Sequence, residues 1–168
     1  FAKIKHIVDA EREKGEVLFV VAGDIFSGNP VVDSHEEKGY PLIDIMNRVG
    51  VDVTVLGNHE YDYGEEHLKN RIAQAEFEFI CANVNTEGSL VSQPKPYTEI
   101  SVGNLDIVLL GLVETNGSNN ETIPSTHPWR VQNMEFSRPE TVVAEYDDLK
   151  NSVNADVYIA LTHIGHNG

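Results

Sequence analysis

The sequence has little cysteine, little positive charge and no long hydrophobic run. Its single cysteine, Cys81, cannot form an internal disulfide, which excludes a disulfide-stapled scaffold. No segment approaches the roughly 18 consecutive apolar residues of a membrane-spanning helix. Only 12 Lys and Arg residues stand against 27 Asp and Glu, giving a formal net charge of −15. Such a surface repels duplex nucleic acid and anionic membranes, so neither is expected as a partner. A phosphate substrate stays possible, because bound metal ions can invert the local field in one cleft.

What the chain does contain is a regular alternation of helical and strand patterns. Its 168 residues suffice for one domain with a hydrophobic core and are too few for two comfortable ones. Helix-strand alternation of this kind builds a parallel or mostly parallel sheet covered by helices, so we predict an α/β fold. The pattern predicts helices at 1–14, 35–49 and 65–75 and strands at 17–22, 51–56 and 77–82.

The rhythm changes in the second half of the chain. "YTEISV" and "LDIVLLGLV" flank Gly103-Asn104, a two-residue turn typical of a β-hairpin. A polar loop is predicted for 114–134 and a helix for 137–153, with Pro139 in its first turn. "DVYIAL", at 156–161, predicts a last buried strand.

Polar clusters follow three of the predicted strands, reading "AGDIFSGNP", "LGNHEYDYG" and "ALTHIGHNG". Ligands of open α/β sheets bind outside the carboxyl ends of the strands, so these loops are expected to converge. Each cluster alone is more typical of a turn or a solvated histidine, and only their coincidence at one edge favours a metal site. Carboxylate, amide and imidazole groups together suit Mn²⁺, Zn²⁺, Fe or Co. The candidates are Asp24, Asn58, His59 and His163, with His166 interpreted as a supporting or solvated residue.

The motifs together resemble a known family. "GDIFSGNP", "MNRVGVDVTVLGNHEYDYG", "ANV" and "IALTHIG" are similar, in this order, to the calcineurin-like metallophosphoesterases. More narrowly, they resemble the bacterial 5′-nucleotidase and 2′,3′-cyclic phosphodiesterase family. "GNHEYDYG" carries most of the specificity. The resemblance implies a layered β-sheet core flanked by helices and a reaction in which metal-bound hydroxide attacks a nucleotide phosphoester directly.

The resemblance also implies roles for individual residues. Asp24 would bridge two divalent metal ions, and Asn58 and His163 would ligate the second of them. His59 would face the scissile phosphate and be oriented by Asp62. An imidazole held by a carboxylate has a fixed ring and favours its charged form, which suits the stabilisation of a transferring phosphoryl group.

Two parts of the family pattern are not at their usual places. No Asp-x-His strand precedes the first helix, and no Gly-His segment follows at a distance beyond "THIG". We therefore expect residues 1–168 to be a single partial catalytic domain, truncated at both ends and lacking the C-terminal domain that grips the nucleoside. With three of the ligands, this chain is expected to hold at most one metal ion weakly and to be nearly inactive by itself.

Two alternatives to a nucleotidase remain open. The same fold could cleave another ester, as a nucleotide-sugar or thiosulfate-type hydrolase does, or it could be a non-catalytic module that binds a metal or a partner. The family resemblance further implies an extracytoplasmic location, whether periplasmic, secreted or attached to the cell wall.

Overall fold

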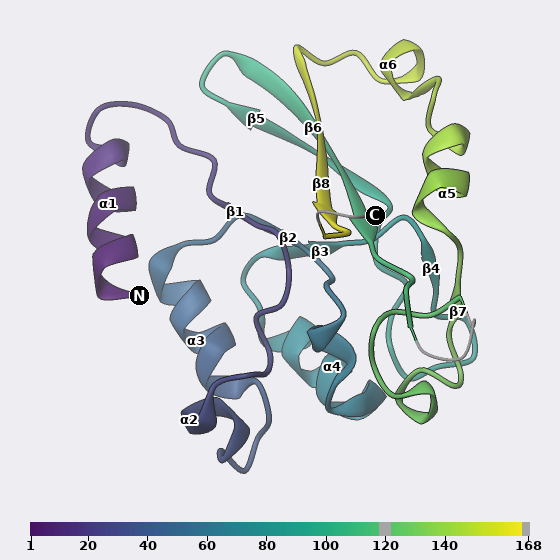
Figure 1. Cartoon of the computed structure of the whole chain (residues 1–168). Coiled ribbons are helices and arrows are strands. Elements are labelled where there is room, and N and C mark those ends of the chain that lie inside the picture. Colours follow the sequence, from purple (N-terminus) through teal and green to yellow (C-terminus); the bar gives the residue numbers. More distant parts are fainter. Residues whose placement is uncertain (118–121, 166–168) are drawn as a thin grey trace.

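The computed structural model describes residues 1–117 and 122–165 and has an α/β fold (Figure 1). None of the helices in this described part is both long and apolar enough to cross a membrane. The elements, in chain order, are α1 (Ala2–Arg12), β1 (Val20–Val21), α2 (Pro30–Asp33), α3 (Tyr40–Val49), β2 (Val53–Val55), the 3₁₀ turn η1 (His59–Tyr61), α4 (Gly64–Gln74), β3 (Glu78–Ile80), β4 (Val84–Asn85), β5 (Tyr97–Val102), β6 (Leu105–Val113), the 3₁₀ turn η3 (Pro128–Arg130), β7 (Glu135–Phe136), α5 (Pro139–Glu145), α6 (Leu149–Ser152) and β8 (Val157–His163).

The strands form two three-stranded sheets and one short pair. The first sheet has the order β1-β2-β3 and is parallel, as predicted for the first half of the chain. The second has the order β5-β6-β8, in which the predicted hairpin β5–β6 is antiparallel and β8 joins β6 in parallel. Strands β4 and β7 pair separately. The expectation that all strand ends share one sheet edge is therefore wrong, because β8 belongs to the second sheet.

The two three-stranded sheets pack face to face. Alternate residues of β2 point to opposite sides, so Val53 and Val55 meet the second sheet, where they join Ile80, Leu109 and Leu161 in one buried cluster. Each such side chain contributes about 1.5–3 kcal/mol to the free energy of folding when it is fully buried. Helices α3 and α4 cover the opposite face of the first sheet through a second cluster. Strand β2 is consequently buried on both faces, as its apolar run predicts.

Several element boundaries differ from the predictions. Helix α3 begins at Tyr40 rather than at 35, since Gly39 takes a left-handed φ of 75° and ends the preceding loop. A short additional helix, α2, starts at Pro30. The helix predicted for 137–153 is broken into α5 and α6 around Asp147-Asp148, and aspartate favours turns and helix caps over helix interiors.

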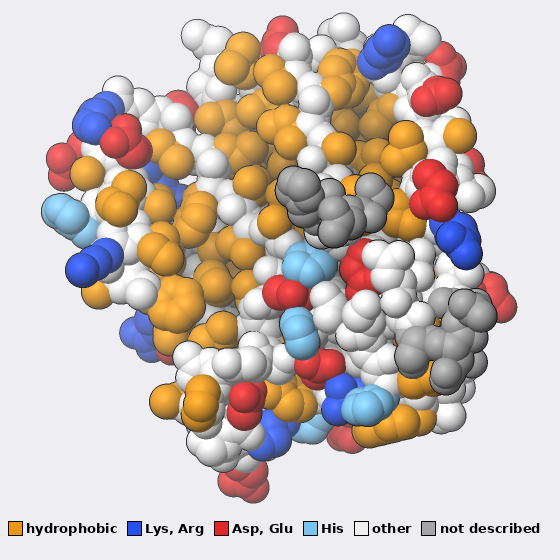
Figure 2. Space-filling view, viewed as in Figure 1, with side chains coloured by type: hydrophobic (Ala, Val, Ile, Leu, Met, Phe, Trp, Pro, Cys, Tyr) orange, Lys and Arg blue, Asp and Glu red, His pale blue; other side chains and the backbone are white. Residues whose placement is uncertain are grey.

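Strand β8 is less buried than its apolar sequence predicts. Tyr158 and Ile159, which point to opposite faces of the sheet, are 39% and 36% exposed, because β8 lies at an edge of its sheet and the described residues cover neither face completely at this point. Helix α1 likewise exposes Phe1, Ile4 and Ile7, and only Val8 of its apolar face is buried. Figure 2 shows hydrophobic side chains that extend across the molecule between these two elements. A continuous apolar surface of this kind is typical of an interface.

Candidate active site

Three loops at strand ends meet at one point. Asp24 follows β1, Asn58 follows β2, and His163 is the last residue of β8. Nε2 of His163 lies 3.1 Å from Oδ2 of Asp24 and 3.1 Å from Oδ1 of Asn58. Although β8 belongs to the other sheet, the packing of the two sheets brings its end to the end of β1, where Nδ1 of His163 lies 2.7 Å from the carbonyl oxygen of Ala22. The structure therefore brings together all three predicted ligand residues.

The orientation of these side chains leaves three acceptor atoms facing one another. Nδ1 of His163 donates to the Ala22 carbonyl, which leaves the lone pair on Nε2. The amide of Asn58 donates through Nδ2 to the carbonyl of Ser125 at 3.1 Å, which turns its Oδ1 inward. A proton on His163 or a bound cation satisfies this arrangement. Within residues 1–117 and 122–165, no group of three or more His, Cys, Asp or Glu side chains is placed to hold a metal, so the set depends on the Asn58 oxygen.

Asn58 is itself held by the loop that follows β6. The buried carboxylate of Glu114 accepts hydrogen bonds from the backbone N–H groups of Ser125 and Asn116, both at 2.5 Å. This fixes the Ser125 carbonyl against which Asn58 is oriented. Neither Glu114 nor Ser125 was assigned a role by the sequence, because a single acidic residue at the start of a loop carries no recognisable motif.

Glu60 joins the first two loops from beneath. Its side chain is 0% exposed, and its carboxylate accepts from the N–H groups of Asp24 (2.9 Å), Ile25 (2.5 Å) and Gly57 (2.5 Å). Burial raises the pKa of Glu60, and these three hydrogen bonds act against the rise. Asp24 has a positive φ of 60°, a left-handed conformation that costs a non-glycine residue roughly 1–2 kcal/mol. The bond to Glu60 holds Asp24 in that conformation.

Glycines let the two loops approach closely. A Cβ atom on Gly23, whose φ is 79°, would lie 2.7 Å from the backbone nitrogen of Gly57. A Cβ on Gly57 would in turn clash with Oδ1 of Asp24 and lie 2.7 Å from the backbone nitrogen of Asp24. Neither position can carry a larger residue without displacing Asp24, so both glycines of "GD" and "GNHE" are required by the geometry of the site.

His59 and Asp62 form the predicted pair. They lie on one turn, η1 and the residue after it, which places Nδ1 of His59 2.5 Å from Oδ2 of Asp62. The hydrogen bond to Asp62 raises the pKa of His59, despite the opposing effect of partial burial. Burial would raise the pKa of Asp62, but hydrogen bonds from His59 and Ser27 outweigh it, and that pKa is lowered. His59 is 47% exposed and Asp62 17%, so the ring faces solvent while its carboxylate partner is enclosed.

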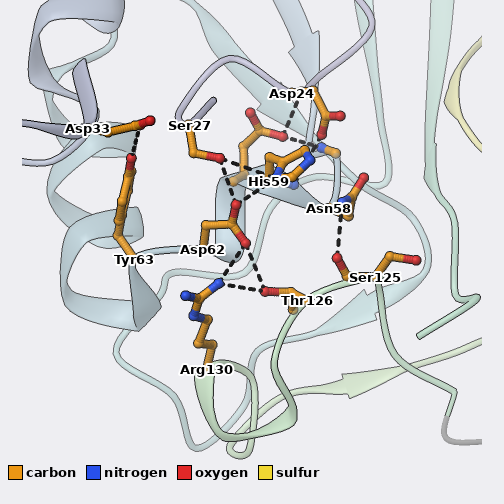
Figure 3. A network of polar contacts seen from close by, with 12 residues as sticks. Asp24, Ser27, Asp33, Asn58, His59, Asp62, Tyr63, Ser125, Thr126 and Arg130 are labelled. Atoms are coloured by element: carbon orange, nitrogen blue, oxygen red, sulfur yellow. Dashed lines mark hydrogen bonds and ion pairs between the residues drawn. The ribbon is translucent and has the colours of Figure 1, made fainter. Parts of the chain in front are cut away.

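Three further side chains bind Asp62, and sequence reasoning did not identify them (Figure 3). Ser27 donates to Oδ2 at 2.6 Å. Thr126 and Arg130 donate to Oδ1 at 3.1 Å and 2.8 Å. Ser27 lies within the quoted "GDIFSGNP" motif, whereas Thr126 and Arg130 lie in the predicted polar loop, where nothing in the residue spacing points to Asp62. A cavity of about 330 Å³ adjoins the pair and is lined by Asp62, Ser125, Thr126, His127 and Arg130.

Three other features near the motifs are not assigned to this cluster, and one of them, an Asp-x-His triplet, was overlooked in the sequence. His166 is outside the described residues. Asp33-Ser34-His35, an Asp-x-His triplet that follows the Gly-Asp motif, is not on a strand, and Asp33 accepts a hydrogen bond from the hydroxyl of Tyr63. Tyr61 is 1% exposed and packs edge-on against Phe136, so it is a packing residue beside the pair.

This fold and these loops are those of a calcineurin-like phosphoesterase. The chain belongs to that family, which it matches over residues 1–168. It is related to the bacterial 5′-nucleotidases and 2′,3′-cyclic phosphodiesterases within it, and the predicted family and fold class are therefore confirmed.

Individual relatives match nearly all of this chain but only part of their own length. A 5′-nucleotidase of Vibrio cholerae is 30% identical over 94% of the chain and 28% of the relative. A 2′,3′-cyclic-nucleotide 2′-phosphodiesterase/3′-nucleotidase of Haemophilus influenzae is 27% identical over 95% of the chain and 26% of the relative. The crystal structure of a 5′-nucleotidase precursor from Thermus thermophilus superposes with a TM-score of 0.78 at 25% identity, covering 98% of this chain and 31% of the other. The chain thus spans under a third of the length of these relatives.

Proposed function

We propose that this chain is a catalytic part of a metal-dependent phosphoesterase that hydrolyses nucleotides. The observation that carries the proposal is the convergence of Asp24, Asn58 and His163, in which Nε2 of His163 lies 3.1 Å from an oxygen of each of the other two, beside the His59–Asp62 pair. Family membership supports hydrolysis of phosphoesters, and the names of the relatives support nucleotides as the substrate class.

The donor set fits one divalent cation. Ligand atoms at about 2.0–2.2 Å from a metal and about 90° apart lie close to 3 Å from each other, which is the spacing found between Nε2 of His163 and each of the two oxygens. A carboxylate, an amide oxygen and an imidazole suit a borderline ion such as Mn²⁺ or Zn²⁺. Asp24, Asn58 and His163 would hold this ion, and Asp24 would share a second. When bound, such ions activate water and neutralise phosphate charge.

His59 is placed to act on the phosphate. Its Nδ1 is engaged by Asp62, so the ring has one orientation, and Nε2 makes no hydrogen bond within the described residues. The raised pKa keeps more of the ring protonated near neutral pH, and the protonated Nε2 donates a hydrogen bond to a phosphate oxygen. Asp62 acts only through His59. The network of Ser27, Thr126 and Arg130 keeps Asp62 ionised and in place.

The runner-up functions keep the same fold. A hydrolase of nucleotide sugars or of a thiosulfate-type ester would use the same ions, and a Thermus thermophilus sulfate thiohydrolase has the same fold at 21% identity. A non-catalytic metal-binding or partner-binding module would not need the His59–Asp62 pair, and the intact pair is the observation that favours the enzyme. An extracytoplasmic location, the partial-domain boundaries at 1–168 and near-inactivity of this chain by itself stay predictions.

Calorimetric titration of Mn²⁺ and Zn²⁺ into this chain tests the proposal. We expect one weak site or none, and weaker binding still after His163→Ala. His6→Ala is the matched control, because His6 lies on an exposed position of α1. Measurable binding that is unchanged by His163→Ala would contradict the proposed ligand set, and two tight sites would contradict the expectation of at most one weak site. A panel of nucleotide monophosphates, 2′,3′-cyclic nucleotides and nucleotide sugars, assayed with the longer enzyme, separates the substrate alternatives.

A further inference from the structure

We propose that Arg130 is a positioning residue that fixes Asp62, and through it the ring of His59, in the working orientation. This inference rests on the proposed function of the His59–Asp62 pair. The guanidinium NH1 atom lies 2.8 Å from Oδ1 of Asp62, on the opposite carboxylate oxygen from the one that contacts His59.

The carboxylate of Asp62 is bound on both of its oxygens. Oδ2 meets His59 and Ser27, whereas Oδ1 meets Arg130 and Thr126. An ionised carboxylate offers about four lone-pair positions, so four donors occupy all of them and leave it no free rotation. Hydrogen bonds from a cation to a carboxylate are about twice as strong as neutral ones, which makes Arg130 the strongest restraint on the Oδ1 side.

Burial strengthens the attraction between Arg130 and Asp62. Asp62 and Arg130 are 17% and 22% exposed, so solvent screens their attraction less than that of a surface pair. Figure 3 shows Arg130 approaching Asp62 from the side away from Ser27, with His59 between Asp62 and Asp24. The guanidinium also lies 5.3 Å from the ring centre of Trp129, which limits its movement.

Anchoring of the loop does not require this ion pair. Val131, the next residue, is 2% exposed and joins the main core cluster together with Met134, so the segment is already fixed to the core. The Nε atom of Arg130 is buried and has no hydrogen-bond partner among the described residues, which costs stability. An arginine whose Nε atom is left unpaired, and whose NH1 atom binds the carboxylate that orients His59, is better explained by the pair than by the fold.

The test is a spectroscopic measurement on this chain, labelled with ¹⁵N at histidine, in a chelator and at one fixed pH. Because Asp62 accepts the Nδ1–H proton of His59, that proton is protected from exchange with water. Arg130→Met is expected to speed its exchange about tenfold or more, the effect of losing one charge-assisted hydrogen bond. Arg130→Lys should recover much of the protection. Arg138→Met is the matched control, since Arg138 is 65% exposed and makes only a long ion pair with Glu140, at 3.8 Å.

Each outcome decides the proposal. Faster exchange in Arg130→Met, recovered by lysine and absent in the control, supports it. Exchange within twofold of wild type in a folded Arg130→Met chain overturns it, whatever the change in melting temperature. If Arg130→Met does not fold, Arg130→Gln removes the charge while keeping a polar side chain, and exchange within twofold of wild type in that variant also overturns it.

A kinetic measurement separates this inference from the proposed function. In the longer enzyme, Arg130→Met should lower kcat by about 10–100-fold with KM unchanged. The substitution misplaces the ring of His59 and leaves the binding of the substrate as it was. A rise in KM alone would make Arg130 a substrate contact and overturn the positioning role. Wild-type enzyme that hydrolyses no ester of the panel would refute the proposed function, while the exchange measurement still decides the role of Arg130.

Discussion

Replacing Glu60 should destabilise the fold and disturb the site together. Its carboxylate is fully buried and is the common acceptor for the N–H groups of Asp24, Ile25 and Gly57. Glu60→Ala leaves two buried donors and one part-buried donor without a partner, at about 1–3 kcal/mol each. The gain from no longer burying a charge offsets part of this, so we expect a net loss of about 3–5 kcal/mol. That is a large share of the roughly 5–15 kcal/mol by which a domain is stable.

A graded series of variants makes the measurement specific. Glu60→Gln keeps the shape and one acceptor oxygen but turns an NH₂ group toward at least one donor, so a loss of about 1–3 kcal/mol is expected. Glu87→Gln is the matched control at an exposed position and should change stability by less than about 0.5 kcal/mol. Urea unfolding followed by circular dichroism gives all three values. A Glu60→Ala chain within about 1 kcal/mol of the control would refute the argument that this carboxylate holds the two loops.

Three further predictions concern other parts of the chain. Gly111→Ala should destabilise the packing of the two sheets, because the new Cβ would lie 2.8 Å from the carbonyl oxygen of Ile80; a melting temperature equal to wild type would contradict this. The thiol of Cys81 is 0% exposed and burial raises its pKa to about 12, so a thiol reagent should modify it only after denaturant is added, and fast labelling of the native chain would disprove the burial. The His59–Asp62 pair should stabilise the metal-free chain most at about pH 5–6. The contribution of His59 to stability is complete below pH 6.5 and is lost as pH rises through its raised pKa. The contribution of Asp62 is present above pH 3.8 and is lost as pH falls through its lowered pKa. Unfolding free energies of wild type and His59→Ala across pH 4–9 measure this, and a difference that keeps growing toward pH 9 would show the sign to be wrong.

The fold class could be predicted from local sequence patterns. The errors of the prediction lie at a sheet edge and at an interruption between two helices. The buried strand β2 and the hairpin at Gly103-Asn104 were predictable, because an apolar run and a two-residue turn each specify a local conformation. The exposure of β8 was not, since an apolar run indicates that a strand prefers burial and not whether a neighbour covers it. The break between α5 and α6 has a local cue in Asp147-Asp148, which the predicted 137–153 helix overlooked.

Some features of the candidate site were also predictable from the sequence, and others were not. His59 and Asp62 are three residues apart on one turn, so their contact is a local consequence of the sequence. The motifs also predicted Asp24, Asn58 and His163 as ligand residues, and the structure places the three side chains together. Their convergence was expected at one sheet edge and is instead produced by the packing of two sheets, which brings Asn58 and His163 together across 105 residues.

The sequence by itself determined which kinds of chemical group are available at the site and to which family the chain belongs. The tertiary structure alone decided what holds those groups in place: Glu60 beneath the two glycine loops, Ser125 against Asn58, and Arg130 on Asp62 across 68 residues. The physical reason is that a motif records residues placed along the chain, whereas a hydrogen bond requires donor and acceptor within about 3 Å in space. For residues far apart in the chain, only the packing of the sheets and loops sets that distance.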